Sequence, residues 1–255
     1  MSRFASYPSL AGRVVFVSGG GSGIGASIVE HFAAQGAKVG FVDIDEAASK
    51  ALVEKLGGAG YPPPLFAKCD VRDIAAYQAA IATVAAKFGP VTVLINNAAR
   101  DDRHDLADVT PAFWDERIAV NLRHQYFAIQ AVAPGMKKAG GGSIVNFSSV
   151  SYHTMTPQLS VYQAAKAAVI GMTRGLARDL GPDGIRLNAI TPGWIMTQRQ
   201  IDLWLTPEAE AALMMAQCLK EKVYPPDIAR MALWLAADDS RLVTAQNFVV
   251  DGGRM

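Results

Sequence analysis

SGGGSGIGASIV, residues 18–29, is a glycine-rich turn that follows a short apolar run and opens an amphipathic stretch. This is the context in which a dinucleotide-binding loop is found, between a strand and a helix. Glycines make the tight turn and let the backbone approach a pyrophosphate, whose charge then lies at the start of the helix. The stretch therefore predicts a nucleotide-binding α/β fold, with two possible registers, Gly21-x-Gly23-x-x-Ala26 and Gly19-x-x-x-Gly23-x-Gly25.

Short β-rich runs alternate with longer helical patterns along the whole chain. The runs occupy residues 13–19, 37–43, 64–70, 90–97, 142–149, 185–190 and 247–253. Strands that are apolar throughout are expected where helices cover both faces of a parallel sheet. The pattern predicts one domain over residues 1–255, a doubly wound α/β Rossmann fold with about seven parallel strands. Extra helical sequence before Pro226 predicts a small helical lid over about residues 194–225.

The overall composition excludes several classes of protein. Lys+Arg 24 against Asp+Glu 23 gives a formal charge of +1, which argues against a nucleic-acid or anionic-membrane partner. Two cysteines are too few for a disulfide framework, and the four histidines form no metal-ligand pattern, so no metal is expected. No apolar leader and no run of membrane-spanning length is present. We expect a soluble cytoplasmic protein.

Asp43 ends the second apolar run, 18 residues after Gly25. At that position a carboxylate accepts hydrogen bonds from the diol of an adenine ribose. The same charge repels a 2′-phosphate, and neither Ser22 nor Ile44 supplies the cation that NADP requires. The sequence thus favours NAD as the cofactor.

Tyr162 and Lys166 are four residues apart in a strong helical pattern, so they share one helix face. A tyrosine titrates near pH 10, too high for a base at neutral pH, but a neighbouring ammonium lowers the pKa of the phenol. The pair makes a general base for an alcohol proton. Tyr152 has Thr156 at the equivalent offset and lacks such a partner.

Further short segments occur in a fixed order with these motifs. They are CDV (69–71), NNAA (96–99), VNL (120–122), the serine pair 148–149, YQAAK (162–166) and ITPGWIMT (190–197). Over essentially its full length the chain resembles the short-chain dehydrogenase/reductase family. The resemblance implies a Rossmann fold and a catalytic set of Asn121, Ser149, Tyr162 and Lys166.

The resemblance also implies a role for each member of the set. Ser149 hydrogen-bonds the substrate oxygen, Tyr162 exchanges the proton, Lys166 lowers the tyrosine pKa and holds the nicotinamide ribose, and Asn121 positions a water. Ser149 is preferred to Ser148 and Ser151 because the family's serine precedes the tyrosine by about thirteen residues. The implied cofactor-binding residues are Gly19, Ser22, Gly23, Ile24, Gly25, Asp43, Ile44, Asp70, Val71, Asn97, Ala98, Ala99, Tyr162, Lys166, Pro192, Gly193, Ile195 and Thr197.

Several segments look similar to the bacterial NAD-dependent aldose 1-dehydrogenases of the family, of the D-xylose type; they are residues 101–110, 113–124, 131–147, 172–186 and 216–220. This likeness implies hydride transfer from the C1 hydroxyl of an aldose such as xylose, galactose or arabinose to NAD, giving the lactone. The residues expected to bind the sugar are Ser149, Ser151, His153, Gln158, Tyr162, Gln163 and Trp194.

Two other functions stay open at this stage. One is a dehydrogenase or reductase of another polar secondary alcohol or ketone, such as a polyol or a 3-oxoacyl compound. The other is a non-catalytic NAD-binding regulator, which the presence of both Tyr162 and Lys166 disfavours. The resemblance further implies a homotetramer, with the C-terminal run in an interface.

Overall fold

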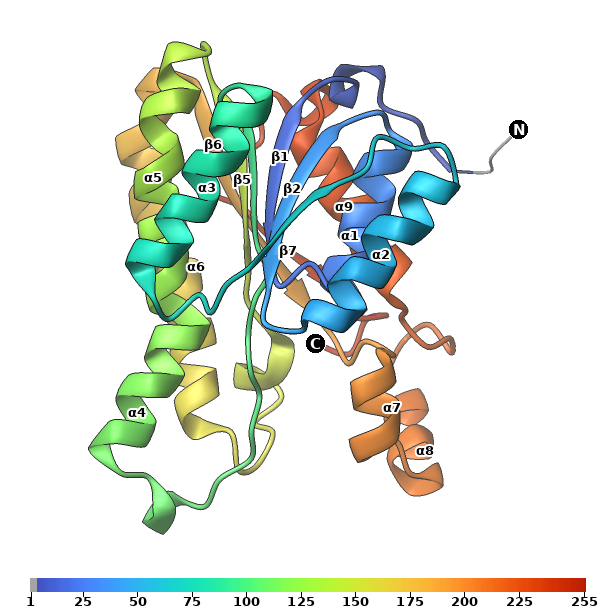
Figure 1. Cartoon of the computed structure of the whole chain (residues 1–255). Helices are drawn as coiled ribbons and strands as arrows, with labels where there is room; N and C mark the ends of the chain where they lie inside the picture. The colour runs from blue at the N-terminus through green and yellow to red at the C-terminus, as the bar shows by residue number, and fades with distance from the viewer. Residues whose placement is uncertain (1–3) are drawn as a thin grey trace.

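Seven parallel strands form the central sheet of the computed structural model, which describes residues 4–255 (Figure 1). Their order across the sheet is β3-β2-β1-β4-β5-β6-β7. Each strand falls within or next to one of the apolar runs, so the predicted doubly wound Rossmann fold is confirmed. The strands are β1 Val14–Ser18, β2 Lys38–Asp43, β3 Leu65–Lys68, β4 Val93–Asn96, β5 Gly142–Phe147, β6 Ile185–Pro192 and β7 Asn247–Val250.

Helices cover both faces of this sheet. In Figure 1, α1 (Gly23–Ala34), α2 (Glu46–Gly58) and α9 (Pro225–Ala236) lie on one side, with α3 (Ile74–Phe88), α5 (His124–Lys138) and α6 (Ser160–Leu180) on the other. The pleat of β1 turns alternate side chains to opposite faces. Val15 and Val17 pack into the core under α1 and α9, and Val14 and Phe16 into the core under α3 and α5. Both faces of the strand are buried, which is why its sequence is apolar without alternation.

The chain crosses the sheet in opposite directions on the two sides of β1. It runs outward through β2 and β3, then returns to place β4 on the other side of β1. In such sheets the carboxyl ends at the reversal open a crevice for ligands. The Ser18 hydroxyl accepts hydrogen bonds from the backbone N–H groups of Asn97 and Ala98, both at 3.1 Å, and so ties the two strand ends together.

A π-helical turn, Ala119–Arg123, joins α4 (Pro111–Ile118) to α5. Such turns hold one residue more than an α-helical turn and cluster at functional sites. Asn121 lies in this turn and is fully buried.

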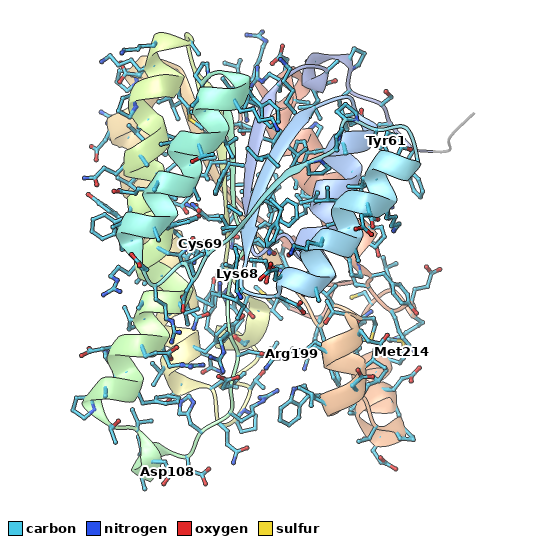
Figure 2. All side chains as sticks on the ribbon, in the orientation of Figure 1. Tyr61, Lys68, Cys69, Asp108, Arg199 and Met214 are labelled. Atoms are coloured by element: carbon cyan, nitrogen blue, oxygen red, sulfur yellow. The ribbon has the colours of Figure 1, made fainter. Side chains whose placement is uncertain are left out.

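Residues 194–225 leave the sheet after β6 and carry two short helices, α7 (Gln198–Trp204) and α8 (Pro207–Ala216), which lie beyond the carboxyl ends of the strands in Figure 1. A parallel bridge between Ile195 and Val223 closes the base of this excursion. Figure 2 shows Arg199 on the side of α7 that faces the rest of the chain. Of the helices in residues 4–255, none combines the length and apolarity needed to cross a bilayer.

Candidate active site

A cavity of about 1000 Å³ opens at the carboxyl edge of the sheet. Its walls come from the glycine loop, the ends of β2, β4, β5 and β6, the start of α6, and α7. All the residues named above as cofactor-binding line this one cavity, from Gly19 in the glycine loop to Thr197 before α7. The strand ends therefore bring together residues that are far apart in the sequence.

The glycine loop leaves its backbone open to the cavity. Gly19 and Gly23 have φ values of +66° and +53°, a region that side chains other than glycine's rarely allow. A Cβ atom added to Gly25 would lie 1.8 Å from the carbonyl oxygen of Gly19, so no side chain fits there. The first N–H groups of α1 and its positive dipole end lie at this opening. The loop fits a pyrophosphate, and thus a dinucleotide, in shape and in charge.

Asp43 lines the same cavity at the end of β2. One oxygen of its carboxylate accepts a hydrogen bond from the Gly21 N–H at 2.8 Å, and the other accepts one from the Asp45 N–H at 3.0 Å. These two bonds fix the orientation of the charge beside the glycine loop. No salt bridge to Asp43 is found among residues 4–255.

Lys166 is buried beneath the cavity, with 1% of its surface exposed. Its Nζ donates a hydrogen bond to the Phe147 carbonyl at 2.9 Å and lies 5.6 Å from the centre of the Tyr162 ring. Burial lowers the pKa of Lys166 to about 7, and the negative charge of Asp101 opposes this shift. One turn of α6 thus places the ammonium directly beneath the tyrosine.

Tyr162 and Ser149 both line the cavity, and the Ser149 side chain is close enough to the phenol to lower its pKa. Burial raises the pKa of Tyr162 well above its usual value, and the Asp101 carboxylate adds to the rise. The Ser149 side chain and the charges of Arg199 and Arg103 act in the opposite direction. The phenol is therefore neutral until additional positive charge lies close to it.

Asn121 lies outside the residues that line the cavity. Its side-chain oxygen accepts a hydrogen bond from the Arg100 N–H at 2.9 Å, and its amide group donates to the carbonyls of Arg100 and Arg117, each at 3.0 Å. The side chain thus joins the loop after β4 to the π-helical turn.

Of the residues expected to bind substrate, Ser149, Ser151, Tyr162 and Trp194 line the cavity, but three others do not. His153 is exposed and its ring packs on Tyr152, with 3.9 Å between the centroids. The Gln158 amide donates to Asp105 at 2.8 Å.

Gln163 is the third of these exceptions. It follows Tyr162 on α6, and one residue turns its side chain by about 100° around the helix, away from the cavity. Its amide instead donates to the carbonyls of Ser151 and Thr156, at 3.0 and 2.6 Å, and holds the loop after β5.

The sequence did not single out the residues that join the loop after β4 to α7. Asp101 Oδ1 accepts a hydrogen bond from Arg199 Nη1 at 2.6 Å, and Asp101 Oδ2 accepts one from Gln200 Nε2 at 2.8 Å. Gln200 Oε1 in turn accepts a hydrogen bond from the Trp194 indole at 2.9 Å. Other cavity-lining residues that the sequence analysis did not propose include Arg103, Thr154, Thr156 and Trp204. The only signal for this set was the charged run at 101–105, whose pattern resembles a solvated surface.

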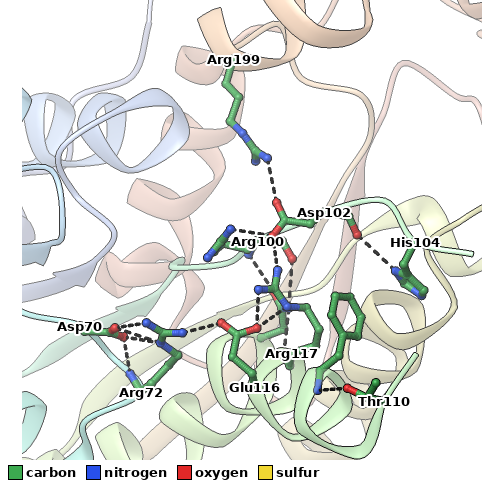
Figure 3. A network of polar contacts seen from close by, with 11 residues as sticks. Asp70, Arg72, Arg100, Asp102, His104, Thr110, Glu116, Arg117 and Arg199 are labelled. Carbon is green, nitrogen blue, oxygen red and sulfur yellow. Dashed lines mark hydrogen bonds and ion pairs between the residues drawn. The ribbon is translucent and has the colours of Figure 1, made fainter. Parts of the chain in front are cut away.

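The adjacent Asp102 is the centre of a wider network, drawn in Figure 3. Its carboxylate pairs with Arg199 at 3.3 Å, Arg100 at 2.7 Å and Arg117. Glu116 continues the network from Arg117 to Arg72, whose guanidinium holds Asp70, one of the cofactor-binding residues expected from the sequence. The network connects α7 with the end of the cavity that lies beyond β3.

Comparison with known proteins agrees with this geometry over almost the whole chain. Residues 19–254 match a family model described as enoyl-(acyl carrier protein) reductase. A D-xylose 1-dehydrogenase of Caulobacter vibrioides is 51% identical over 249 residues, covering 98% of this chain and 98% of the relative. A probable galactose dehydrogenase of Rhizobium meliloti is also 51% identical, covering 98% and 97%.

Solved structures agree as well. A 7α-hydroxysteroid dehydrogenase, determined with NADH and 7-oxo glycochenodeoxycholic acid, superposes with a TM-score of 0.92 at 30% identity, covering 97% of this chain and 96% of that one. The protein belongs to the short-chain dehydrogenase/reductase family.

Proposed function

We propose that the protein is an NAD-dependent aldose 1-dehydrogenase, which oxidises the C1 hydroxyl of a sugar such as xylose or galactose to the lactone. The observation that carries the proposal is the convergence of Ser149, Tyr162 and Lys166 with the glycine loop in one cavity. The lining of that cavity includes polar side chains from the loop after β4, the loop after β5 and α7, which suits a ligand with many hydroxyls. The two relatives at 51% identity, both named as sugar dehydrogenases, support the choice of substrate class.

In the proposed reaction the chain's own residues handle the proton. Ser149 orients the substrate hydroxyl by a hydrogen bond, and the Tyr162 phenolate removes the hydroxyl proton. Lys166 stabilises that phenolate by its charge. The nicotinamide cofactor, when bound, supplies the acceptor for the hydride that leaves C1. Asn121, held by Arg100 and Arg117, is a positioning residue for the loop after β4 in this scheme.

NAD is the cofactor that the charges of the site favour. The glycine loop and the start of α1 suit the pyrophosphate, and the fixed Asp43 carboxylate suits a ribose diol while repelling a 2′-phosphate. The neighbouring side chains Ile44 and Asp45 provide no positive charge.

Residues 194–225 act as a lid in this proposal, and two hydrogen bonds made by α7 support that role. Arg199 and Gln200 both bind Asp101, so α7 is tied across the mouth of the cavity. We also propose a homotetramer, in which the edge strand β7 lies in an interface. Its Val249 is 39% exposed, and the strand has one neighbour, β6, in the sheet.

The test of the proposed function is NADH formation, followed by absorbance, with xylose, arabinose, galactose, fucose and rhamnose as substrates. A polyol and a 3-oxoacyl thioester (the latter with NADH) test the second candidate reaction in the same assay. Turnover of one or more aldoses, with lactone as product, is the expected result. Turnover of the polyol or thioester alone would contradict it, and light scattering gives the number of subunits independently.

A further inference from the structure

Trp194 lies in the turn between β6 and α7, is partly exposed and lines the cavity. Its indole ring has a single polar group, the Nε1–H, which can donate a hydrogen bond but cannot accept one. That N–H donates to Gln200 Oε1 at 2.9 Å. Because the one hydrogen-bonding group of the ring is already used, the part of Trp194 that remains for a ligand in the cavity is its ring carbons.

The side-chain amide of Gln200 is held at both ends. Its Oε1 accepts from the Trp194 indole, and its Nε2 donates to Asp101 Oδ2 at 2.8 Å. An amide presents an acceptor on one side and donors on the other, so these two contacts fix which way it faces. A reversed amide would turn its NH2 group toward the indole N–H and its oxygen toward a carboxylate. Each contact therefore orients the amide for the other.

Further hydrogen bonds fix the groups on both sides of this amide. The Gln200 backbone N–H donates to Thr197 Oγ1 at 3.3 Å, at the start of α7. The second oxygen of Asp101, Oδ1, accepts from Arg199 Nη1 at 2.6 Å. The two carboxylate oxygens are thus divided between two successive residues of α7. A carboxylate on the loop after β4 therefore sets the orientation of an indole in the turn after β6, through Gln200.

We propose that Gln200 is a positioning residue, which holds Trp194 so that its ring carbons form a platform for the C–H groups of the bound sugar. The proposal rests on the aldose dehydrogenase function proposed above. A sugar ring presents C–H groups between its hydroxyls, and an indole offers them a large and rigid apolar surface. Such a surface selects one orientation of the sugar only if the indole is itself fixed. Asp101 fixes it through Gln200 while α7 is attached to the loop after β4.

Exchanging the polar groups of the two side chains tests this assignment. Gln200→Glu places a carboxylate against Asp101, and the two like charges repel each other. Adding Asp101→Asn restores the hydrogen bonds with donor and acceptor exchanged. The new amide at position 101 donates to the new carboxylate at position 200, which still accepts from the Trp194 indole, and the amide oxygen can still accept from Arg199.

Two further variants complete the set. Gln200→Met removes both side-chain hydrogen bonds without adding a charge, and it provides the same comparison with wild type if the charged variant is unstable. Gln130→Glu is the matched control, because it adds the same charge at an exposed position of α5 outside the cavity lining.

Each protein is assayed at its own optimal pH for kcat, the KM for the best aldose and the KM for NAD, and its melting temperature is measured. The fluorescence emission of Trp194 is obtained as the difference between each protein and the same protein carrying Trp194→Phe. This emission reports the surroundings of the indole whether or not a sugar is turned over.

We expect Gln200→Glu and Gln200→Met to raise the sugar KM by roughly tenfold and to shift the Trp194 emission, since residues in direct contact are strongly coupled. The double variant Asp101→Asn/Gln200→Glu should recover both, to within about threefold of the wild-type KM. A merely structural defect would not be repaired by a second substitution. The KM for NAD should stay unchanged, because the bond to Thr197 is made by the backbone of Gln200.

Two results would overturn the proposal, and they are distinguishable. If the wild-type protein oxidises aldoses but the double variant is as impaired as Gln200→Glu alone, or the Trp194 emission is the same in all variants, Gln200 does not position Trp194 and the proposed function stands. If no aldose gives NADH with the wild-type protein, the proposed function is wrong, and the platform for a sugar is wrong with it.

Discussion

Asp101 forms an ion pair with Arg199, with 2.6 Å between Oδ1 and Nη1, although 98 residues separate them in the sequence. The pair fastens α7 to the loop after β4, and both charges act on Tyr162 in opposite directions. Asp101 raises the pKa of the phenol and Arg199 lowers it. The same two side chains thus attach the proposed lid to the loop after β4 and shift the pKa of the proposed base.

Removing either charge should shift the pH profile, and the two shifts should have opposite signs. Because Asp101 raises the pKa of Tyr162, Asp101→Asn should move the alkaline rise of kcat/KM for the sugar to lower pH. Arg199→Gln should move it to higher pH. Both should raise the sugar KM a fewfold by loosening α7. Asp105→Asn, at an exposed carboxylate, serves as the control, and shifts of equal sign in the two variants would contradict the assignment.

Tyr162→Phe should lower kcat by roughly 10²- to 10⁴-fold, the usual contribution of a general base. NADH binding, followed by fluorescence, should persist because the glycine loop is unaffected. Tyr152→Phe is the matched control, since Tyr152 packs on His153 and does not line the cavity. Full turnover in Tyr162→Phe would exclude the proposed base.

Asp43→Asn should weaken the preference for NAD over NADP by about tenfold or more, which corresponds to about 1.4 kcal/mol of lost discrimination. The substitution removes the charge and keeps an oxygen that can accept from the Gly21 N–H. Asp73→Asn is the control because Asp73 lies outside the cavity lining and caps α3, where asparagine caps equally well. An unchanged ratio of kcat/KM for the two cofactors would show that Asp43 does not contact the ribose.

Gly25→Ala should destabilise the protein, because the new Cβ would lie 1.8 Å from the Gly19 carbonyl oxygen. A cost of about 1–3 kcal/mol is typical of overpacking, and it corresponds to a fall in Tm of roughly 2–12 °C for a chain of this size. Gly58→Ala, at the end of α2 where nothing lies within 4 Å, should leave Tm unchanged or raise it. Calorimetry of both variants tests the pair, and equal Tm values would contradict the close approach.

The sheet and the glycine loop were predictable because their signals are local. A strand that is buried on both faces must be apolar along its length, as β1 is, and a backbone with no room at Gly25 must use glycine. Seven such runs and one such loop were enough to predict the fold.

The substrate side was less predictable because its geometry depends on the tertiary structure. The loop after β5 turns at Met155 and Gln158, which have φ values of 50° and 60°, and this turn carries Gln158 away from the cavity. No sequence pattern signals a left-handed conformation at these residue types. The charges at 101–103 resembled a solvated run because Asp101 and Asp102 pair with Arg199 on α7, almost 100 residues later.

The π-helical turn at 119–123 works as an angular spacer between α4 and α5. Deleting one residue from it would give a regular α-helix with a more ordinary hydrogen-bond ladder, and would rotate α4 by about 100° relative to α5. Arg117 would then leave Asp102, and the loop that carries Asp101 would lose the hydrogen bonds between Arg100 and Asn121. A deletion that makes the hydrogen bonding of the helix more regular would therefore break the attachment of α7, which lies on the other side of the cavity.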